Sequence, residues 1–400
     1  MKTIVPEGYK KTKVGVIPND WQLYRTDKVL KRVRNSVDVI ADEEYKQIGI
    51  RSHGKGIFYK ETVSGKELGN KSVFWIEPDC FIVNIVFAWE QAIGKTTENE
   101  VGMIASHRFP MYKPQANKVD LDYLVYLFKS KRGKYLLELA SPGGAGRNKT
   151  LGQGEFAELE IALAPFKEQQ KIANILTTYD EAIVKQEELI KEKEELKKGL
   201  MQKLLSGEVR FDEFSDEWKE VRLEEIASIT MGQSPDSSSY NENNIGVPLI
   251  QGNADCKNRT TSPRMYTTQK TKECFIGDII MTVRAPVGAI SKSLHNACIG
   301  RGVCSIKSKY QNDFLYHYLI GYEEKWSSYS QGSTFTAVNS SDIKNLKIKL
   351  PLLQEQQKIA EVLSLAVNEI NLLKNELEEL KLQKKALMQK LLTGQVRVKV

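Results

Sequence analysis

Two long stretches of the chain, residues 166–207 and 353–394, place apolar residues at the spacing of a coiled-coil helix. The steps between apolar residues alternate between four and three, which is the a/d pattern of heptads. Helix-forming Glu, Lys, Leu and Gln dominate both stretches, and Gly207 and Gly394 follow the last leucines where a C-cap glycine is expected. We therefore predict two helices of about 38 residues, or about 57 Å each.

The apolar seam of each helix identifies the residues that would pair with another helix. Gln186, Lys193 and Lys197 dilute the first seam, and Leu189 and Leu196 are expected to widen its apolar stripe. The predicted helix-pairing residues are Ile172, Leu176, Tyr179, Ile183, Ile190, Leu200 and Leu204 in the first stretch, and Ile359, Leu363, Ile370, Leu373, Leu377, Leu380, Leu387 and Leu391 in the second.

The two stretches are copies of one repeat. Glu168-Gln-Gln-Lys-Ile-Ala173 recurs at residues 355–360, and Met201-Gln-Lys-Leu-Leu-Ser-Gly-Glu-Val-Arg210 recurs with two changes at residues 388–397. Both matches have the same offset, so the helices have equal length between matching ends. An isolated seam would leave leucines exposed to water, which costs free energy and solubility, so we expect the two helices to pack together.

A globular segment precedes each helix, and the two segments resemble each other weakly. Trp21 and Trp218 stand near their starts, and residues 79–87 and 273–283 each predict a short buried strand. A helix capped by Asp122 or Asp313, a glycine-containing loop and a final strand follow in each segment. The predicted fold class is α+β, with domains at 1–165 and 208–352, long helices at 166–207 and 353–394, and a tail at 395–400.

Composition excludes several classes of protein. An apolar content of 41% and a charged content of 27% are typical of globular proteins, and no apolar run is long enough to span a membrane. The first residues lack the apolar core of a signal peptide, and five cysteines without a Cys-x-x-Cys pair favour free thiols in the cytoplasm. The four histidines have no cysteine or carboxylate at metal-ligand spacing, so no metal site is expected.

The net charge of +7 is carried by the globular segments. Residues 1–165 contain 25 basic and 20 acidic residues, residues 214–353 contain 16 and 14, and the helical remainder contains 17 of each. Mildly basic domains joined by neutral helices suit a polyanionic partner such as nucleic acid.

Motifs for catalysis or nucleotide binding fail on inspection. Gly143-Gly-Ala-Gly-Arg-Asn-Lys-Thr150 resembles a phosphate-binding loop, but Asn148 replaces the second required glycine. Residues 78–92 resemble a metal-dependent nuclease site, but Ala92 replaces the expected lysine. No adenine-methylation or S-adenosylmethionine motif is present, so we expect no catalytic residues in this chain.

Basic, amide and aromatic residues instead gather in probable loops of both domains. Arginine and lysine can bind guanine edges, asparagine and glutamine can bind adenine edges, and roughly half of the contacts should go to phosphate. The candidate DNA-binding residues are Arg51, His53, Lys55, Tyr59, Arg108, Arg147, Asn148 and Lys149 in the first domain, and Gln251, Asn253, Lys257, Arg259, Arg264, Arg284, Gln331, Ser333 and Thr334 in the second.

With the repeat established, the chain resembles the specificity subunit of type I restriction–modification systems over essentially its whole length. The resemblance is carried by the paired Glu-Gln-Gln-Lys-Ile-Ala boxes, the repeated helix ends, Ile17-Pro-Asn-Asp-Trp21, residues 277–288 and Gly332-Ser-Thr-Phe335. One departure is Ala164-Pro165, where the family usually has two prolines.

The resemblance implies two target recognition domains that read the halves of a bipartite, asymmetric DNA sequence. The long helices would pack antiparallel, set the spacing between the half-sites and bind two methyltransferase subunits, which flip and methylate adenine. Restriction subunits would join to cleave DNA. The chain itself would bind no cofactor, and S-adenosylmethionine, ATP and Mg would serve the partner subunits.

Two other classes of protein fit parts of the pattern. A recognition region fused to its own methyltransferase and nuclease would be an enzyme, and the missing motifs argue against it. A coiled-coil scaffold with no DNA role would not need two loop-rich basic domains, and a coiled-coil DNA-binding protein without a restriction role is kept as an alternative.

Overall fold

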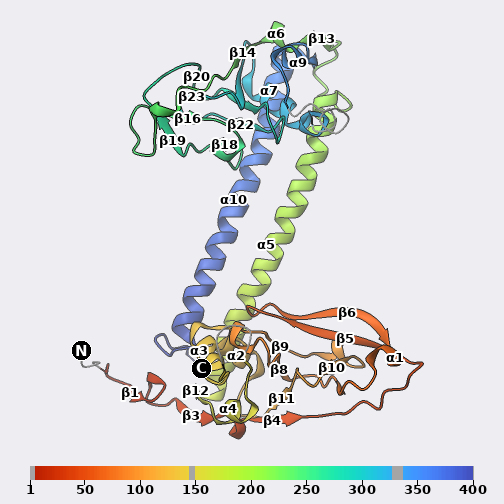
Figure 1. The fold of residues 1–400 in the computed structure, drawn as a ribbon, viewed down its shortest axis with the longest axis vertical. Helices are drawn as coiled ribbons and strands as arrows, with labels where there is room; N and C mark the ends of the chain where they lie inside the picture. Colours follow the sequence, from red (N-terminus) through yellow and green to blue (C-terminus); the bar gives the residue numbers. More distant parts are fainter. Residues whose placement is uncertain (1–4, 144–148, 327–336, 400) are drawn as a thin grey trace. The chain divides into compact units, whose positions relative to one another are not determined.

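The computed structural model describes residues 5–143, 149–326 and 337–399, and their contacts form two compact units. Unit 1 comprises Met1–Gln186 and Glu376–Val400, and unit 2 comprises Glu187–Asn375. Each unit therefore holds one globular domain together with parts of both long helices, α5 (Phe166–Ser206) and α10 (Leu353–Leu391) (Figure 1). In the described residues, no helix is long and apolar enough to cross a membrane.

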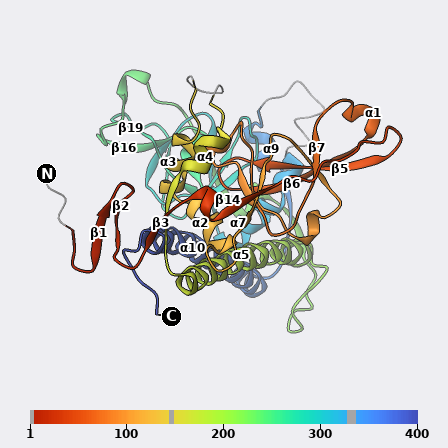
Figure 2. The ribbon, with the colours of Figure 1, turned by 90° about the horizontal axis from the view of Figure 1, so that it is seen from below.

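Unit 1 is built from two four-stranded sheets and a layer of short helices. The sheets have the strand orders β4-β11-β8-β9 and β6-β5-β10-β7. Helices α2, α3 and α4 lie together in the view of Figure 2, and an aromatic group of Phe81, Phe128 and Phe156 joins the first sheet to them. The strands are β1 (Tyr9–Thr12), β2 (Gly15–Pro18), β3 (Gln22–Arg25), β4 (Leu30–Val33), β5 (Glu44–Arg51), β6 (Gly56–Ser64), β7 (Val73–Trp75), β8 (Phe81–Val83), β9 (Ile93–Lys95), β10 (Ile104–Ser106), β11 (Met111–Pro114) and β12 (Glu160–Leu163). The helices are η1 (Thr26–Lys28), α1 (Gly65–Leu68), η2 (Ala88–Glu90), η3 (Glu98–Glu100), α2 (Leu121–Lys129), α3 (Lys131–Leu139) and α4 (Gln153–Glu158).

Unit 2 repeats this plan with more and shorter strands. Its sheets have the orders β14-β24-β21-β22-β18-β17 and β15-β19-β16-β23-β20. The strands are β13 (Lys219–Arg222), β14 (Ala227–Met231), β15 (Tyr240–Asn241), β16 (Val247–Ile250), β17 (Cys256–Lys257), β18 (Thr260–Thr261), β19 (Met265–Thr267), β20 (Glu273–Cys274), β21 (Ile279–Thr282), β22 (Ile290–Lys292), β23 (Ala297–Ile299), β24 (Val303–Ser308) and β25 (Lys347–Leu350). The helices are α6 (Leu223–Ile226), η5 (Ser237–Ser239), η6 (Asn253–Asp255), α7 (Asn312–Gly321) and α9 (Ser340–Lys344).

The strand pairings make the two units topologically equivalent. The order β4-β11-β8-β9 in unit 1 corresponds to β14-β24-β21-β22 in unit 2, with every pair antiparallel. In the second sheets, β10 pairs parallel with β5 and antiparallel with β7, and β23 pairs in the same way with β16 and β20. The expected fold class, two α+β domains in tandem with long helices, is therefore confirmed.

The long helices pair antiparallel within each unit. In unit 1, Asp180 binds Lys384 and Gln186 hydrogen-bonds Glu376, and in unit 2, Lys193 lies 2.6 Å from Glu369 while Leu204 and Ile359 share one apolar cluster. Residue numbers rise along one helix as they fall along the other, which defines an antiparallel coiled coil. All fifteen predicted seam residues are buried or half-buried. Leu189 and Leu196, expected to widen the apolar stripe, lie on the flank of the seam and are 37% and 57% exposed.

The long helices α5 and α10 start at Phe166 and Leu353, and two details of the globular domains differ from the sequence prediction. The N-caps are Asp120 and Gln311, two residues before the predicted Asp122 and Asp313. Residues 273–283 form two strands in different sheets, β20 and β21, because a turn at Gly277, whose φ is +90°, separates them. Gly207 and Gly394 have φ values of +75° and +72°, as expected of C-cap glycines.

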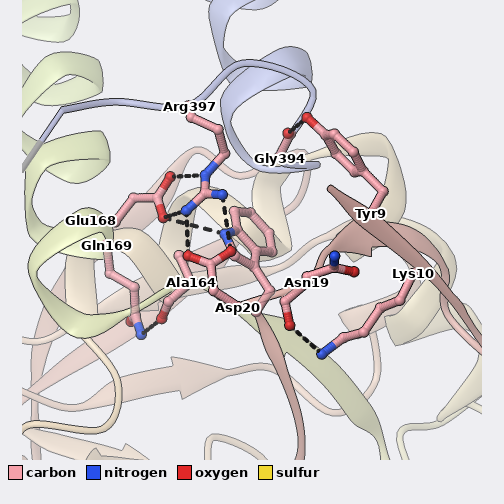
Figure 3. Close-up of polar contacts among 10 residues, drawn as sticks. Tyr9, Lys10, Asn19, Asp20, Ala164, Glu168, Gln169, Gly394 and Arg397 are labelled. Atoms are coloured by element: carbon pink, nitrogen blue, oxygen red, sulfur yellow. Dashed lines mark hydrogen bonds and ion pairs between the residues drawn. The ribbon is translucent and has the colours of Figure 1, made fainter. Parts of the chain in front are cut away.

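A buried carboxylate ties the two ends of the repeat together in unit 1. Glu168, at the start of α5, is 1% exposed and accepts two hydrogen bonds of 2.8 Å from the guanidinium of Arg397, which follows α10 (Figure 3). Arg397 also forks onto Asp20, and the indole of Trp21 donates to Glu168. These bonds raise the pKa of Arg397, and Arg397 lowers the pKa of Asp20.

Unit 2 contains the same arrangement with the helices exchanged. Arg210, which follows α5, donates to both oxygens of Glu355 at 2.9 and 2.7 Å, and the indole of Trp218 donates to the same carboxylate at 3.1 Å. Glu355 starts α10 and is also 1% exposed. Each repeated box therefore supplies a buried carboxylate, and the end of the other helix supplies the arginine that neutralises it.

We expect the Arg397→Ala variant to lose stability because it leaves Glu168 buried without its cationic partner. The cost should be roughly 2 kcal/mol, below the ~3–5 kcal/mol of a fully buried pair because the guanidinium is partly exposed. Denaturant unfolding would measure it, with the exposed Lys399→Ala as a control. Adding Glu168→Gln should recover part of the loss, and an equal loss in Lys399→Ala would contradict the assignment.

Stability should also fall between pH 6.5 and about 4 because of His317. This residue lies in α7 at 2% exposure, its Nε2 is 3.1 Å from Ser364 Oγ, and burial followed by Lys292 lowers its pKa from 6.5 to about 4. The unfolded state binds the proton first as the pH falls, so this group destabilises the fold by up to roughly 3 kcal/mol at the acid end of the window. The unfolding free energy, measured at several pH values, should depend less steeply on pH in His317→Gln. The control is His53→Gln, at an exposed residue, which should show the pH dependence of the parent chain.

Candidate nucleic-acid interface

In unit 1, three of the segments that carry predicted DNA-binding residues meet at one loop, residues 84–92 between β8 and β9. The backbone N–H of Ile85 donates to the carbonyl of Arg108 at 3.0 Å, and the carbonyl of Ile85 accepts from Leu151 at 2.8 Å. Arg108 belongs to the exposed turn before β11, and Leu151 follows the loop that contains Lys149. The loop is therefore held on both sides by main-chain hydrogen bonds.

The turn between β5 and β6 joins the same loop from a third side. The N–H of His53 donates to the carbonyl of Glu90 at 2.6 Å, and Ser52 Oγ donates to the Glu90 carboxylate at 3.0 Å. Gln91 takes a left-handed conformation with φ +57°, and its amide donates to the carbonyls of Phe128 and Ser130 between α2 and α3. Residues far apart in the sequence thus reach one surface.

Most predicted side chains at this surface are exposed. Arg51, His53, Lys55 and Arg108 face solvent, and the Arg51 guanidinium lies 4.9 Å from the centre of the Phe58 ring. The half-buried Lys149 places its ammonium 5.8 Å from the Trp89 ring centre. Cations held over aromatic faces remain available to phosphate or base edges.

Tyr59 is engaged within the domain. Its hydroxyl donates to Glu100 at 2.6 Å, and this hydrogen bond raises the pKa of Tyr59. Burial alone would raise the pKa of Glu100, but hydrogen bonds from Tyr59 and Thr97 lower it below its ordinary value. The Lys46 ammonium also lies 5.1 Å from the ring centre of Tyr59, so DNA would meet this residue as an already positioned group.

Unit 2 holds the corresponding loop, residues 282–289 between β21 and β22, in the same way. The N–H of Val283 donates to Gly302 at 2.9 Å, and the carbonyl of Val283 accepts from Val338 at 3.0 Å. Gly302 lies in the turn before β24, the counterpart of β11, and a Cβ at this position would come within 2.1 Å of the Gln251 carbonyl. The turn at Gly302 therefore lies against Gln251 at the end of β16, and Arg284, which follows Val283, is exposed.

A buried carboxylate organises two more predicted residues of unit 2. Asp255 is 3% exposed and accepts from the N–H of Gln251 at 2.8 Å and from Arg264 Nε at 3.0 Å. The Arg264 side chain is still 65% exposed, so part of its guanidinium faces solvent. Asn253 and Lys257 are exposed nearby in the chain.

Arg259 has a role within the domain. It occupies the β17–β18 turn with φ +64°, and its guanidinium binds both oxygens of Glu323 and donates to the carbonyl of Ile290 at 3.1 Å. These bonds fix the turn, so the structure gives no support to the prediction that Arg259 reads bases.

Sequence reasoning missed three residues at these surfaces. Arg301 is exposed between Gly300 and Gly302, in the turn that corresponds to His107-Arg108 of unit 1. Phe87 is 36% exposed and Trp89 half-buried in the loop at 84–92. The Gly-Arg-Gly pattern could have identified Arg301, whereas Phe87 lies in an apolar run that predicts only a buried strand.

Five predicted residues, Arg147, Asn148, Gln331, Ser333 and Thr334, lie outside the described residues. The segments that follow them do reach the interface, since Leu151 and Val338 donate to the two loops described above. These residues are 187 positions apart (338 − 151), which is the offset of the helical repeat.

The buried thiols show no sign of activation. Burial raises the pKa of Cys80 to about 11 and that of Cys304 to about 12, so both remain protonated at neutral pH. All five cysteines are free.

Two topologically equivalent domains with exposed basic loops, joined to long helices, define a tandem DNA-specificity protein. A family model described as "Type I restriction modification DNA specificity domain" matches residues 50–197 and 215–382. The chain belongs to this family, the specificity subunits of type I restriction–modification systems, and carries two of its domains in tandem.

Similar proteins match over nearly the whole chain. It is 32% identical to the putative type I restriction enzyme MjaX specificity subunit of Methanocaldococcus jannaschii, over 98% of this chain and 97% of that protein. The MjaVIII specificity subunit of the same organism is 25% identical over the same shares. The fold is similar to the crystal structure of the HsdS subunit from Thermoanaerobacter tengcongensis, with a TM-score of 0.57, 24% identity and coverage of 95% of this chain and 98% of that one.

Proposed function

We propose that each unit binds one half of a bipartite, asymmetric DNA sequence. The observation that carries this proposal is the recurrence of one constellation in both units, with different side chains on the same backbone frame. In each unit a hairpin loop, a basic turn and the segment after a glycine-containing loop are joined by equivalent main-chain hydrogen bonds. A common frame with different side chains suits two domains that recognise different base sequences.

The candidate residues at these surfaces divide into two chemical groups. Arg51, Lys55, Arg108, Lys149 and Lys257 supply positive charge for phosphate or guanine, and Gln251 and Asn253 supply amides for adenine edges. The excess of basic residues in both domains supports an electrostatic attraction to DNA that weakens as the salt concentration rises.

We further propose that this chain recognises DNA and assembles the complex without performing chemistry. Two methyltransferase subunits would supply S-adenosylmethionine chemistry, and restriction subunits would supply ATP- and Mg-dependent cleavage. The protonated, buried thiols and the lack of catalytic motifs in the sequence support this division, and the free cysteines support a cytoplasmic location.

The coiled coil offers a surface for such a partner in unit 2. Leu189, Leu196, Leu365 and Leu372 are between 37% and 64% exposed. Leu189 precedes Ile190 and Leu372 precedes Leu373, and Leu196 and Leu365 lie one heptad further along their helices, so heptad geometry places all four on one face of the antiparallel pair. Contiguous exposed leucines on a helical pair are typical of a protein-binding face.

We expect Leu196→Lys combined with Leu365→Lys to prevent binding of a methyltransferase subunit, because each lysine would carry charge into an apolar interface. Pull-down and sedimentation of the mixed subunits would measure the loss. Leu382→Lys is the matched control, because Leu382 is 65% exposed on the outer face of α10. Equal binding by both variants would show that the four leucines are not the docking surface.

We also propose that the helices set the distance between the half-sites. Inserting seven residues after Gln186 and seven after Asn375 would keep the heptad register and lengthen each helix by about 10 Å. With partner subunits present, adenine-methylation mapping should report both half-site sequences unchanged and a gap longer by roughly three base pairs.

A four-residue insertion at the same points is the control, because it moves the seam and exposes leucines to water. It should reduce both folding and methylation. An active seven-residue variant with an unchanged gap would exclude the helices as the ruler, and no bipartite methylation by the parent complex would overturn the proposed function.

A further inference from the structure

Arg264 is held in place by a buried carboxylate through a single nitrogen of its guanidinium. Its Nε donates to Oδ1 of Asp255 at 3.0 Å, and the Arg264 side chain is 65% exposed whereas Asp255 is 3% exposed. Within the residues that the structure describes, neither Nη1 nor Nη2 of Arg264 makes a hydrogen bond. The carboxylate therefore sets the direction of the side chain and leaves two donor nitrogens for a partner.

Asp255 is itself fixed by the backbone around it. Its N–H donates to the carbonyl of Gly252 at 3.0 Å, and its carbonyl accepts from the N–H of Ser262 at 2.7 Å. Its Oδ2 accepts from the N–H of Gln251 at 2.8 Å, so the carboxylate bridges the end of β16 and the start of β19, two paired strands (Figure 1). An arginine bound to such a group loses little conformational entropy when it meets a ligand.

The same contacts place Arg264 among the recognition loops of unit 2. Gln251 follows β16, and a Cβ on Gly302 would come within 2.1 Å of the Gln251 carbonyl. The carbonyl of Gly302 accepts from Val283, in the hairpin loop between β21 and β22. Direct contacts thus connect Arg264, through Asp255 and Gln251, to the surface proposed to bind DNA.

The ion pair changes what Arg264 can recognise. At neutral pH the pair with Asp255 carries no net charge, so it attracts phosphate less than the exposed Lys257 nearby in the chain. A planar fork with two donor nitrogens in a fixed direction matches the two acceptors of guanine in the major groove, O6 and N7. Adenine presents a donor beside its N7 acceptor and would oppose the second nitrogen of the fork.

We infer that Arg264 reads a guanine in the half-site bound by unit 2, and that Asp255 is the positioning residue that orients it. The inference rests on the proposed function and deepens it, because it names one base and the two residues that select it. It applies to the chain assembled with its methyltransferase subunits.

The test is binding of that complex to DNA libraries randomised in one half-site at a time, with the affinity for unrelated DNA measured at several salt concentrations. Arg264→Ala should lose about fivefold or more of the preference for guanine at one position and leave the other half-site unchanged. Arg264→Lys can keep the ion pair with Asp255, but it should lose the same preference because an ammonium lacks the planar fork. Lys219→Ala removes an exposed charge on β13 and is the control that should keep the preference.

Asp255→Asn separates positioning from support of the fold. Asparagine can still accept from the N–H of Gln251, but it does not neutralise Arg264. The preference for guanine should therefore fall about as much as in Arg264→Ala, while the affinity for unrelated DNA rises and depends more steeply on salt. Arg264→Ala should lower that affinity instead, because it leaves the charge of Asp255 without its partner.

Three outcomes would count against the inference. A retained preference for guanine in Arg264→Ala and Arg264→Lys, or an affinity loss spread evenly over all sequences, would overturn it while the parent complex still selects a bipartite site. In Asp255→Asn, an unchanged preference, or a fall of both the preference and the affinity for unrelated DNA, would overturn the positioning role. A parent complex without bipartite preference would instead overturn the proposed function together with this inference.

Discussion

Both units depend on one interaction, the ion pair between a buried carboxylate at the start of one long helix and an arginine that follows the end of the other. Glu168 and Glu355 would be costly to bury alone, and Arg397 and Arg210 neutralise them from the end of the other helix. Because Trp21 and Trp218 donate to the same carboxylates, the pairing also fixes where each globular domain joins its helix. A helix start, a helix end and a domain entrance are thus specified by one buried group.

A second constraint is the set of main-chain hydrogen bonds that hold the recognition loops of each unit together. Ile85 and Val283 each donate to a basic turn and accept from a segment that follows a glycine-containing loop. Only backbone atoms make these bonds, so the side chains at the surface are free to differ between units. Exposed side chains of these loops can therefore change without a change in the fold.

The sequence predicted the helices and their seam because these depend on local periodicity and on a repeat of fixed offset. The seam residues from Ile172 to Leu391 are buried or half-buried as expected, and Leu189, placed beside the seam, is exposed on its flank. The ties of Glu168 and Glu355 escaped prediction because their partners lie 229 and 145 positions away. Composition identified the loops that carry the candidate DNA-binding residues. It could not show that these loops meet at one surface, because that depends on how the strands pair.

Some candidate DNA-binding residues also have partners within their own domain, which composition alone does not reveal. Arg259 and Tyr59 have the chemistry of DNA contacts, yet each satisfies a carboxylate of its own domain, Glu323 or Glu100. Phe87 has the chemistry of a core residue, yet it is exposed on a loop fixed by its neighbours. The contacts that a side chain makes within its own domain, more than its residue type, therefore decide whether it is free to meet a partner.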